Sequence, residues 1–409
     1  MKIVGISRKQ RRVIIYDEFR YYDGKDYHET TKEEIKRFSF LNSYKSKYIP
    51  IKKDDDKTFE QCFTEFVEKA NTFRKMTLGL GANGEALVNL YKTGSITQTA
   101  KTIFYDYCNR EKIKPDPITA LECNFIKKAS IGALIYSNND YEGPAYEYDF
   151  NSMYPSIMRD DKFKIPIKEG VIKTLSKEEF ENMKSTFFCY GIYRCKITSI
   201  KPNTTDRILF RFNPENYYTT QDLRLAKMLG LQIDIIEEEN NMLYYSKDAL
   251  ISGKKLFSYY VDTLYELKKK DKRFKLILNC LWGLLCKDKK TTLRLDLNAD
   301  TDIDLNTDEV AILSQIIQGS KLIIEYEYIT KSSYVCDFAR MKPFILSSAR
   351  LKLSSIIHPY VDNIQKIHTD GILSDIKLDV VLGDKIGDLR FDGYRENVKI
   401  FNVNKVVDI

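Results

Sequence analysis

Apolar and polar residues alternate along this chain with two periods, and each period predicts a type of element. Residues 58–76 place aromatic and small apolar side chains at helical spacing, which predicts an amphipathic helix. Residues 256–286 predict one long helix or a pair of helices, and residues 342–357 predict another. Residues 80–110 also carry a helical pattern. Helices are therefore expected in several separate segments of the chain.

Strand patterns fill most of the remaining sequence. The apolar and aromatic run of residues 145–150 predicts a buried strand. Strand signals dominate residues 130–150 and 185–250, and strand-like pieces alternate with polar turns in residues 1–55. Residues 296–309 predict a solvated loop. The mixture predicts an α+β fold, and we find no internal repeat in it.

Composition and charge narrow the class of protein. At 409 residues the chain is long enough for two or three domains. The net charge of +7 is a modest bias toward polyanions, and residues 251–295 concentrate it with twelve Lys or Arg against four Asp or Glu. The eight cysteines show no C-x-x-C spacing and there are three histidines, so we expect free thiols in a reducing compartment and no structural zinc. No apolar run approaches the ~20 residues that span a membrane, and no signal peptide is expected before the first strand.

An acidic residue stands at the end of the predicted strand of residues 145–150. The string there reads Tyr148-Asp149-Phe150-Asn151-Ser152-Met153-Tyr154-Pro155-Ser156. Pro155 suits the first turn of a short helix. A carboxylate at the end of a buried strand is costly unless it binds a metal or a partner, so Asp149 is a candidate metal ligand. The alternative is an Asp that caps the following helix.

The basic helical segment carries a second set of candidate residues. Lys275, Asn279 and Trp282 fall at i, i+4 and i+7 and share one helical face, and Gly283 beside them permits close approach. A cation, an amide and a flat aromatic surface suit the phosphates and the base of a nucleotide. The alternative is an amphipathic helix with a solvated lysine.

The third candidate string is Ile367-His368-Thr369-Asp370-Gly371-Ile372-Leu373. Apolar residues on both sides of Asp370-Gly371 predict a β-hairpin, and an ordinary hairpin turn is the alternative to a functional Asp370. An Asp at a strand end, then a basic helix, then an Asp at a hairpin tip is the order found in template-directed polymerases. Asp149 and Asp370 would then hold two Mg²⁺ ions, which Mn²⁺ can replace, for nucleotidyl transfer.

The three strings resemble motifs A, B and C of family B DNA polymerases, in particular the protein-primed branch of phages, adenoviruses and linear plasmids. The resemblance covers residues 125–405. It implies a palm with an antiparallel sheet, helical fingers, insertions and a partial N-terminal exonuclease-like region. The implied divisions are residues 1–125 (exonuclease-like), 126–174 (palm), 175–255 (first terminal-protein-region insertion), 256–290 (fingers), 291–335 (second insertion), 336–383 (palm) and 384–409 (palm end or thumb remnant).

The resemblance also implies residue roles. Tyr154 would exclude a 2′-hydroxyl, Lys275 would contact the triphosphate, and Asn279, Trp282 and Gly283 would complete the nucleotide site. Trp282 stands where the family usually has Tyr. The residues implied to contact primer or template are Lys272, Arg273, Thr369, Lys399 and Lys405.

Three departures from the family pattern matter. His368 replaces the first Asp of Asp-Thr-Asp, which makes the site less acidic. The Asp-x-Glu and second exonuclease motifs have no counterpart, so no proofreading is expected. Only 39 residues follow Asp370 (409 − 370), so the thumb is expected to be missing or minimal.

Three hypotheses follow. The first is a DNA-directed DNA polymerase that uses primer–template DNA and dNTPs, with a terminal protein as a further implied partner and no membrane. It would work in the cytoplasm of a phage host, or in mitochondria if the source is an organellar plasmid. The second is a non-catalytic nucleic-acid-binding or assembly protein derived from a polymerase. The third is one subunit of a split polymerase, with exonuclease or thumb on separate chains.

Overall fold

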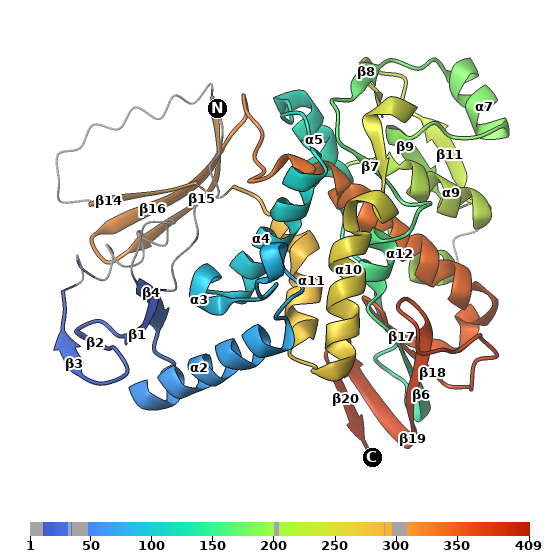
Figure 1. Ribbon diagram of the computed structural model, residues 1–409. Helices are drawn as coiled ribbons and strands as arrows, with labels where there is room; N and C mark the ends of the chain where they lie inside the picture. Colours follow the sequence, from blue (N-terminus) through green and yellow to red (C-terminus); the bar gives the residue numbers. More distant parts are fainter. Residues whose placement is uncertain (1–10, 32–33, 35–47, 200–203, 290, 297–308) are drawn as a thin grey trace. The chain divides into compact units, whose positions relative to one another are not determined.

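The computed structural model describes residues 11–31, 34, 48–199, 204–289, 291–296 and 309–409. The chain forms two compact units, the first made of Met1–Lys112 and Asp262–Leu281, and the second of Ile113–Val261 and Trp282–Ile409. Both units contain helices and strands, which confirms the α+β prediction (Figure 1). Within the described residues, no helix combines the length and apolar character needed to cross a membrane.

The first unit contains a four-stranded sheet with one long helix against it. The strands are β1 (Arg12–Tyr16), β2 (Arg20–Tyr22), β3 (Tyr27–Glu29) and β4 (Tyr48–Lys52), in the order β3-β2-β1-β4. β1 and β4 are parallel and the other pairs antiparallel. Helix α2 (Phe59–Met76) packs on β1 and confirms the helix predicted for residues 58–76. Its first turn is fixed by a capping box in which Thr58 and Gln61 exchange hydrogen bonds.

The rest of the first unit is helical. Its further described elements are η1 (Ala82–Gly84), α3 (Leu90–Thr93), α4 (Ile96–Arg110), the second half of α10 (Gly253–Lys270) and most of α11 (Phe274–Leu285). The helical pattern of residues 80–110 is therefore correct only in part, because turns at Gly84 and Gly94 interrupt it. α10 and α11 confirm the helical pair predicted for residues 256–286. They are separated by a short turn at Asp271 to Arg273.

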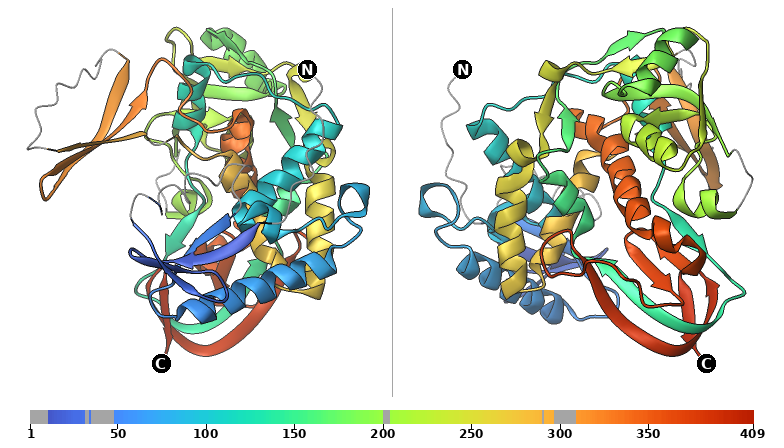
Figure 2. Two further views of the ribbon diagram at one scale, coloured as in Figure 1. Left: turned by 60° about the vertical axis from the view of Figure 1, so that its left-hand side comes forward. Right: turned by 90° about the vertical axis from the view of Figure 1, so that its right-hand side faces the viewer.

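The second unit contains an antiparallel six-stranded sheet, in the order β20-β19-β6-β18-β17-β5. Its strands are β5 (Ile135–Ser137), β6 (Glu142–Phe150), β17 (Ile364–His368), β18 (Gly371–Ser374), β19 (Leu389–Asn402) and β20 (Lys405–Asp408). β6 lies between β18 and β19, so segments more than 200 residues apart in the chain run side by side (Figures 1 and 2).

Helix α12 (Lys342–Ile357) confirms the helix predicted for residues 342–357. It packs against α5 (Ala120–Ala129), α6 (Met153–Met158) and α9 (Thr220–Met228), and it is flanked by η3 (Asp337–Met341) and η4 (His358–Asn363). Two fully buried arginines anchor these contacts. Arg340 pairs with Glu122 at 2.7 Å, and Arg350 pairs with Asp222 at 2.7 Å.

The segment between β6 and α10 forms a separate sheet. Its strands are β8 (Val171–Lys173), β9 (Gly191–Thr198), β10 (Tyr217–Thr219), β11 (Gln232–Ile235) and β12 (Met242–Tyr244). The same segment holds α7 (Lys177–Ser185), α8 (Thr204–Leu209), η2 (Lys247–Ala249) and the pair β7 (Lys164–Pro166) and β13 (Leu250–Ser252).

The prediction that strands dominate residues 185–250 is wrong for α8 and α9. Helix α9 starts at a capping box in which Thr219 and Asp222 bond each other, and the buried pair of Asp222 with Arg350 then fixes its first turn. The local sequence of α9 favours a helix by itself, because its capping box is followed by the helix-forming residues Leu223–Met228.

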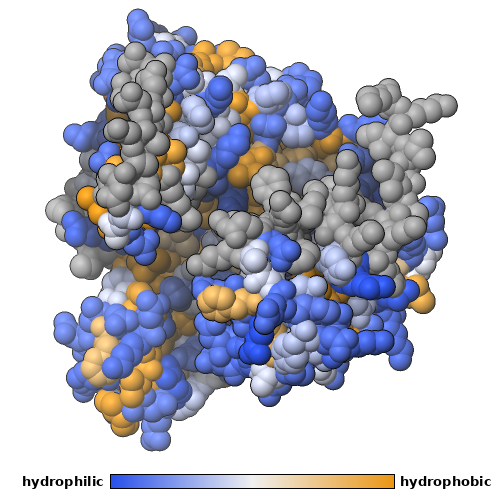
Figure 3. Space-filling model, turned by 90° about the vertical axis from the view of Figure 1, so that its left-hand side faces the viewer, coloured by the Kyte–Doolittle hydropathy of each residue, from blue (hydrophilic) through white to orange (hydrophobic). Residues whose placement is uncertain are grey.

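A three-stranded sheet projects after α11, in the order β14-β16-β15. Its strands are β14 (Thr291–Asp296), β15 (Val310–Gln318) and β16 (Lys321–Tyr328). Most of the predicted loop of residues 296–309 lies outside the described residues. On β15, the side chains of Ile312, Leu313, Ile316 and Ile317 are exposed. The face drawn in Figure 3 is mostly hydrophilic, with separate hydrophobic patches among the charged residues.

Candidate active site

The six-stranded sheet brings Asp149 and Asp370 to one end of neighbouring strands. Asp149 is the penultimate residue of β6 and pairs in register with Gly371, the first residue of β18. Asp370 lies in the turn between β17 and β18, where Thr369 adopts a left-handed φ of 64°. The amide of Asp370 donates to the carbonyl of His368 at 2.9 Å, which closes this tight turn. The hairpin predicted around Asp370 is confirmed, and both carboxylates are partly exposed to solvent.

The turn after Asp149 is held by the loop that precedes β19. The amide of Asn151 donates to the carbonyl of Asp388 at 2.9 Å, and its side-chain Nδ2 donates to the carbonyl of Asp384 at 2.8 Å. Gly387 closes the same loop with a φ of 86°, and a Cβ there would come within 2.6 Å of Ser156. Only glycine fits that position without displacing α6. The end of β6 is therefore held in place by backbone groups of the loop before β19, which is far away in the sequence.

Tyr154 and Trp282 form a stacked aromatic pair in the second unit. Their ring centres are 4.9 Å apart and the planes differ by 15°. Burial, with a smaller contribution from the Asp370 carboxylate, raises the pKa of Tyr154 to about 12. The Tyr154 hydroxyl is therefore neutral at physiological pH, and it can donate a hydrogen bond beside Asp370. Gly283 follows Trp282 with open space where a side chain would be.

Lys275 and Asn279 lie on the part of α11 that belongs to the first unit. Lys275 is exposed to solvent, whereas Asn279 is partly buried. Within the described part of the chain, Asn279 Oδ1 is buried without a hydrogen-bond partner. An unpaired buried acceptor is costly, so this amide is suited to a donor supplied by a ligand.

The residues implied to contact primer or template fall into three places. Lys272 and Arg273 are exposed in the turn before α11, and Arg273 Nη2 is paired with Asp271 at 2.6 Å. Thr369 forms the turn at Asp370. Lys399 on β19 and Lys405 on β20 both lie near one ring, that of Phe401, at 5.8 and 4.8 Å from its centre.

A positively charged side chain that the sequence alone does not predict lies next to Asp149. Arg390 on β19 is directly opposite Asp149 in the β-sheet register, and its Nη2 lies 3.8 Å from Asp149 Oδ2. Nothing in the local sequence around Arg390 signals this neighbour, because the two residues meet only through pairing of β6 with β19. The site is therefore a carboxylate pair with an arginine at one side.

The carboxylate pair fits a divalent ion by its donor chemistry. Asp149 and Asp370 offer hard oxygen ligands, and Mg²⁺ typically takes one or two carboxylates and completes its shell with water and substrate phosphates. Among the described residues, no group of three or more His, Cys, Asp or Glu side chains is placed to hold a metal by itself. His368 is exposed and contributes no carboxylate. Substrate oxygens would therefore have to complete the ion's ligands.

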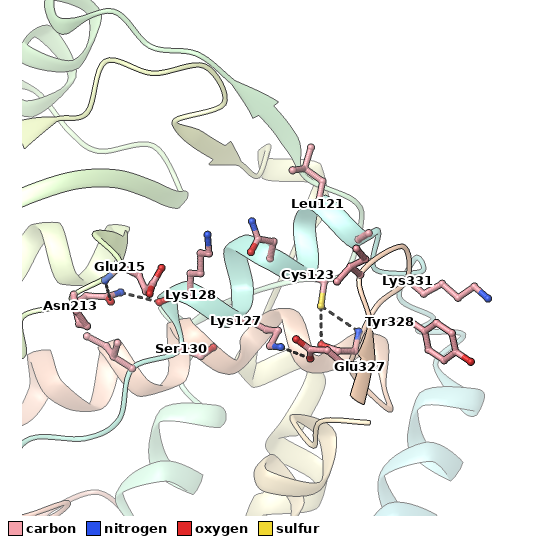
Figure 4. Close-up of a pocket in the computed structure, with 16 residues that line it drawn as sticks. Leu121, Cys123, Lys127, Lys128, Ser130, Asn213, Glu215, Glu327, Tyr328 and Lys331 are labelled. Carbon is pink, nitrogen blue, oxygen red and sulfur yellow. Dashed lines mark hydrogen bonds and ion pairs between the residues drawn. The ribbon is translucent and has the colours of Figure 1, made fainter. Parts of the chain in front are cut away.

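A pocket of about 770 Å³ opens beside α5, in the second unit (Figure 4). Lys127, Lys128 and Lys331 line it together with the exposed Tyr328 and with Asn213. The Asn213 side chain donates to the carbonyl of Lys128 at 2.8 Å, which joins α5 to the neighbouring loop. Glu215 and Glu327 line the pocket as well, and Lys127 pairs with Glu327, so the lining carries charges of both signs.

Comparisons with known proteins agree with this geometry. The family described as "DNA polymerase type B, organellar and viral" matches residues 53–363. A curated relative, the "Probable DNA polymerase" of Neurospora intermedia, is 24% identical over 331 residues, which are 72% of this chain and 31% of that protein. The chain thus spans about a third of the length of this relative.

Solved structures of phi29 DNA polymerase share the fold. The complex with single-stranded DNA matches with a TM-score of 0.56 and 16% identity, covering 86% of this chain and 59% of that chain. The ternary complex with primer–template DNA and incoming nucleotides matches with a TM-score of 0.55 and 17% identity, covering 79% and 58%. The family match extends over more than half of the sequence and includes β6, α11 and α12. This chain therefore belongs to the organellar and viral type B DNA polymerases.

Proposed function

We propose that this chain catalyses template-directed transfer of nucleotides from dNTPs to a primer 3′-hydroxyl. The observation that carries the proposal is the placement of Asp149 and Asp370 at adjacent strand ends, beside the stack of Tyr154 on Trp282. Membership of the polymerase family and the phi29-like fold support it. The two predicted catalytic acids, the predicted steric gate and Trp282 thus come from three segments of the chain, because Asp149 and Tyr154 belong to the same one.

Asp149 and Asp370 would hold two Mg²⁺ ions, or Mn²⁺ in their place. When bound, the ions supply Lewis-acid stabilisation for the primer hydroxyl and for the charge on the triphosphate. Tyr154 presents a neutral ring with which a ribose 2′-hydroxyl would collide. Trp282 stacks on this ring and supports it. Lys275 supplies a positive charge for the triphosphate, and Asn279 supplies a carbonyl oxygen that still needs a donor.

Primer extension by the purified chain tests the proposal. We expect incorporation of dNTPs with Mg²⁺ or Mn²⁺, and a loss of about a thousandfold or more in Asp149→Ala and in Asp370→Ala. Asp408→Ala is the matched control, because Asp408 is an exposed carboxylate on β20 of the same sheet. Extension that survives both active-site substitutions would refute the assignment.

A non-catalytic nucleic-acid-binding role is the second candidate function. His368 in place of an acid and Arg390 beside Asp149 both reduce the negative charge available to a metal. This role predicts salt-sensitive binding of primer–template DNA without incorporation, measured by fluorescence anisotropy and by extension on the same sample. Incorporation above the level of the Asp149→Ala variant excludes it.

We propose further that priming uses a protein hydroxyl and that proofreading is absent. The segment of residues 175–255 stands where the protein-primed branch carries its first insertion, and it forms a sheet with its own buried core around Tyr193, Tyr218 and Leu223. Transfer of labelled dNMP from a dNTP to the hydroxyl of a terminal protein, with release of pyrophosphate, tests the priming mode. A mismatched primer end that persists during incubation without dNTPs tests the absence of proofreading.

Activity that requires a second chain would instead support the split polymerase.

A further inference from the structure

Arg390 occupies a position between two carboxylates at the end of the six-stranded sheet. Directly opposite residues in an antiparallel pair project to the same face, so Arg390 and Asp149 share one face of the sheet. A β-bulge follows at Asp392, because Phe391 pairs with Tyr148 and the next pair is Gly393 with Glu147. The bulge leaves Asp392 outside the ladder, where its carboxylate faces back to Arg390.

The two contacts of Arg390 are unequal. Arg390 Nε donates to Asp392 Oδ1 at 2.5 Å, and Nη2 donates to Asp392 Oδ2 at 3.1 Å, which is a bidentate pair. The contact of Nη2 with Asp149 Oδ2 is longer, at 3.8 Å. The side chains are exposed by 50% for Arg390 and by 34% for both acids. Asp392 therefore fixes the position of the Arg390 guanidinium. Asp149 interacts with this guanidinium only at the position that Asp392 sets.

We infer that Arg390 is a positioning residue that competes with the divalent ion for the Asp149 carboxylate, and that Asp392 sets the strength of this competition by holding the guanidinium. The inference rests on the proposed function, because it assumes that Asp149 binds a metal ion. In the metal-free protein, the Arg390 charge compensates Asp149. When an ion binds, the bidentate pair with Asp392 keeps Arg390 from being left without a counter-ion.

The inference predicts opposite effects for two substitutions. Arg390→Gln removes the competing charge, so metal should bind about threefold to fivefold more tightly, the range expected for a partly exposed ion pair. Asp392→Asn frees the guanidinium to pair with Asp149, so metal should bind more weakly by a similar factor. If Asp392 acts through Arg390, Asp392→Asn should have less effect in the Arg390→Gln background than alone.

Electron paramagnetic resonance of free Mn²⁺ measures this directly. The full chain is titrated with Mn²⁺ without nucleotide or DNA, and Asp149→Ala identifies the site. Arg395→Gln is the matched control: Arg395 lies on the same strand and pairs with Glu147 and Asp408, so it removes the same charge at another position. We expect Arg395→Gln to bind Mn²⁺ like the wild type. Thermal unfolding of each variant verifies that the fold is retained.

Several results would overturn the inference. They are equal effects of Arg390→Gln and Arg395→Gln, an unchanged or lower Mn²⁺ affinity in Arg390→Gln, and the same effect of Asp392→Asn with and without Arg390. A weaker affinity of Arg390→Gln for primer–template DNA with unchanged Mn²⁺ binding would make Arg390 a phosphate contact instead. In these cases primer extension by the wild type leaves the proposed function intact, whereas a wild type that neither extends primers nor binds Mn²⁺ refutes both.

Discussion

Two arginine–aspartate contacts in the second unit have the same chemistry and opposite surroundings. Arg350 and Asp222 are each exposed by 1% and lie 2.7 Å apart, whereas Arg390 and Asp149 are partly exposed and lie 3.8 Å apart. Arg350 also donates to the carbonyls of Ile131 and Gly132 at 2.8 and 2.7 Å. The pair of Arg350 and Asp222 is fixed by burial and joins α9, α12 and the segment after α5. The pair of Arg390 and Asp149 leaves the Asp149 carboxylate able to exchange its partner.

The difference shows that one pair in this unit stabilises the fold, whereas the other leaves its acid available for binding. Breaking a buried pair leaves a charge without a partner and without water, which costs much of the stability of a domain. An exposed pair contributes little to stability because water and salt compete with it. Asp149 can therefore exchange its partner for an ion at small cost, while Asp222 cannot.

The largest expected effect is on activity, and it comes from the exposed acid. Asp149→Asn should lower primer extension by about a thousandfold or more, because it removes one of the two carboxylates that we propose bind the metal ions. The free energy of unfolding should change by less than about 0.5 kcal/mol, since the pair with Arg390 is exposed. Urea denaturation and single-turnover extension on the same preparation measure both. A strong loss of stability would remove the contrast between the two pairs.

The reverse pattern is expected for the buried acid. Asp222→Asn should lower the free energy of unfolding by about 3–5 kcal/mol, because Arg350 keeps its buried charge without compensation. Urea denaturation gives this value, and the folded fraction should still extend primers. Asp234→Asn on β11 is the control, because that side chain is partly exposed and bonds Gln232 on its own strand. Equal destabilisation by both substitutions would contradict the special role of the buried pair.

A smaller effect is expected from the aromatic stack near Asp370. Trp282→Ala removes the ring that supports Tyr154, so KM for dNTPs should rise about threefold to tenfold, given about 0.5–1.5 kcal/mol for a stacked pair. Trp282→Tyr keeps a stacking ring and should restore most of the affinity. Steady-state kinetics with a primed template measure both variants. If the tyrosine variant behaves like the alanine variant, stacking on Tyr154 is not the source of the effect.

The smallest effect concerns pH. The folded-state pKa of Tyr154 is raised by burial to about 12, above the ordinary value of 10.0, so the folded protein holds this proton more tightly than the unfolded chain does. The stability that follows is present below pH 10 and is lost as the pH rises toward 12. The wild type should therefore lose stability relative to Tyr154→Phe over that interval, which paired urea denaturations at pH 9 and pH 11 would detect. A constant difference between the two proteins would show that Tyr154 does not titrate as expected.

Local patterns predicted those elements that local interactions determine. The helices at residues 58–76 and 342–357 and the hairpin at Asp370 follow from periodicity and turn chemistry, and their bounds match closely. Helix α9 was missed although its capping box at Thr219 and Asp222 is a local signal, because the strand pattern of the neighbouring residues dominated the interpretation of that segment. Arg390 was missed for a different reason, since only the pairing of β6 with β19 places it beside Asp149. The division into palm, fingers and insertions remains a prediction, and so do the roles of all the candidate catalytic, metal-binding, nucleotide-binding and primer-binding residues.

The position of β6 between β18 and β19 has a consequence for how the protein matures on the ribosome. Asp149 leaves the exit tunnel long before the two strands that flank it, and those strands are needed to fix its side chain. Pairings of such high sequence separation form late, since a long loop must close before any contact is gained. A nascent chain that ends before Leu389 should hold a folded β9–β12 sheet and bind no metal at Asp149. The site at Asp149 is thus expected to form only after β19 has left the exit tunnel.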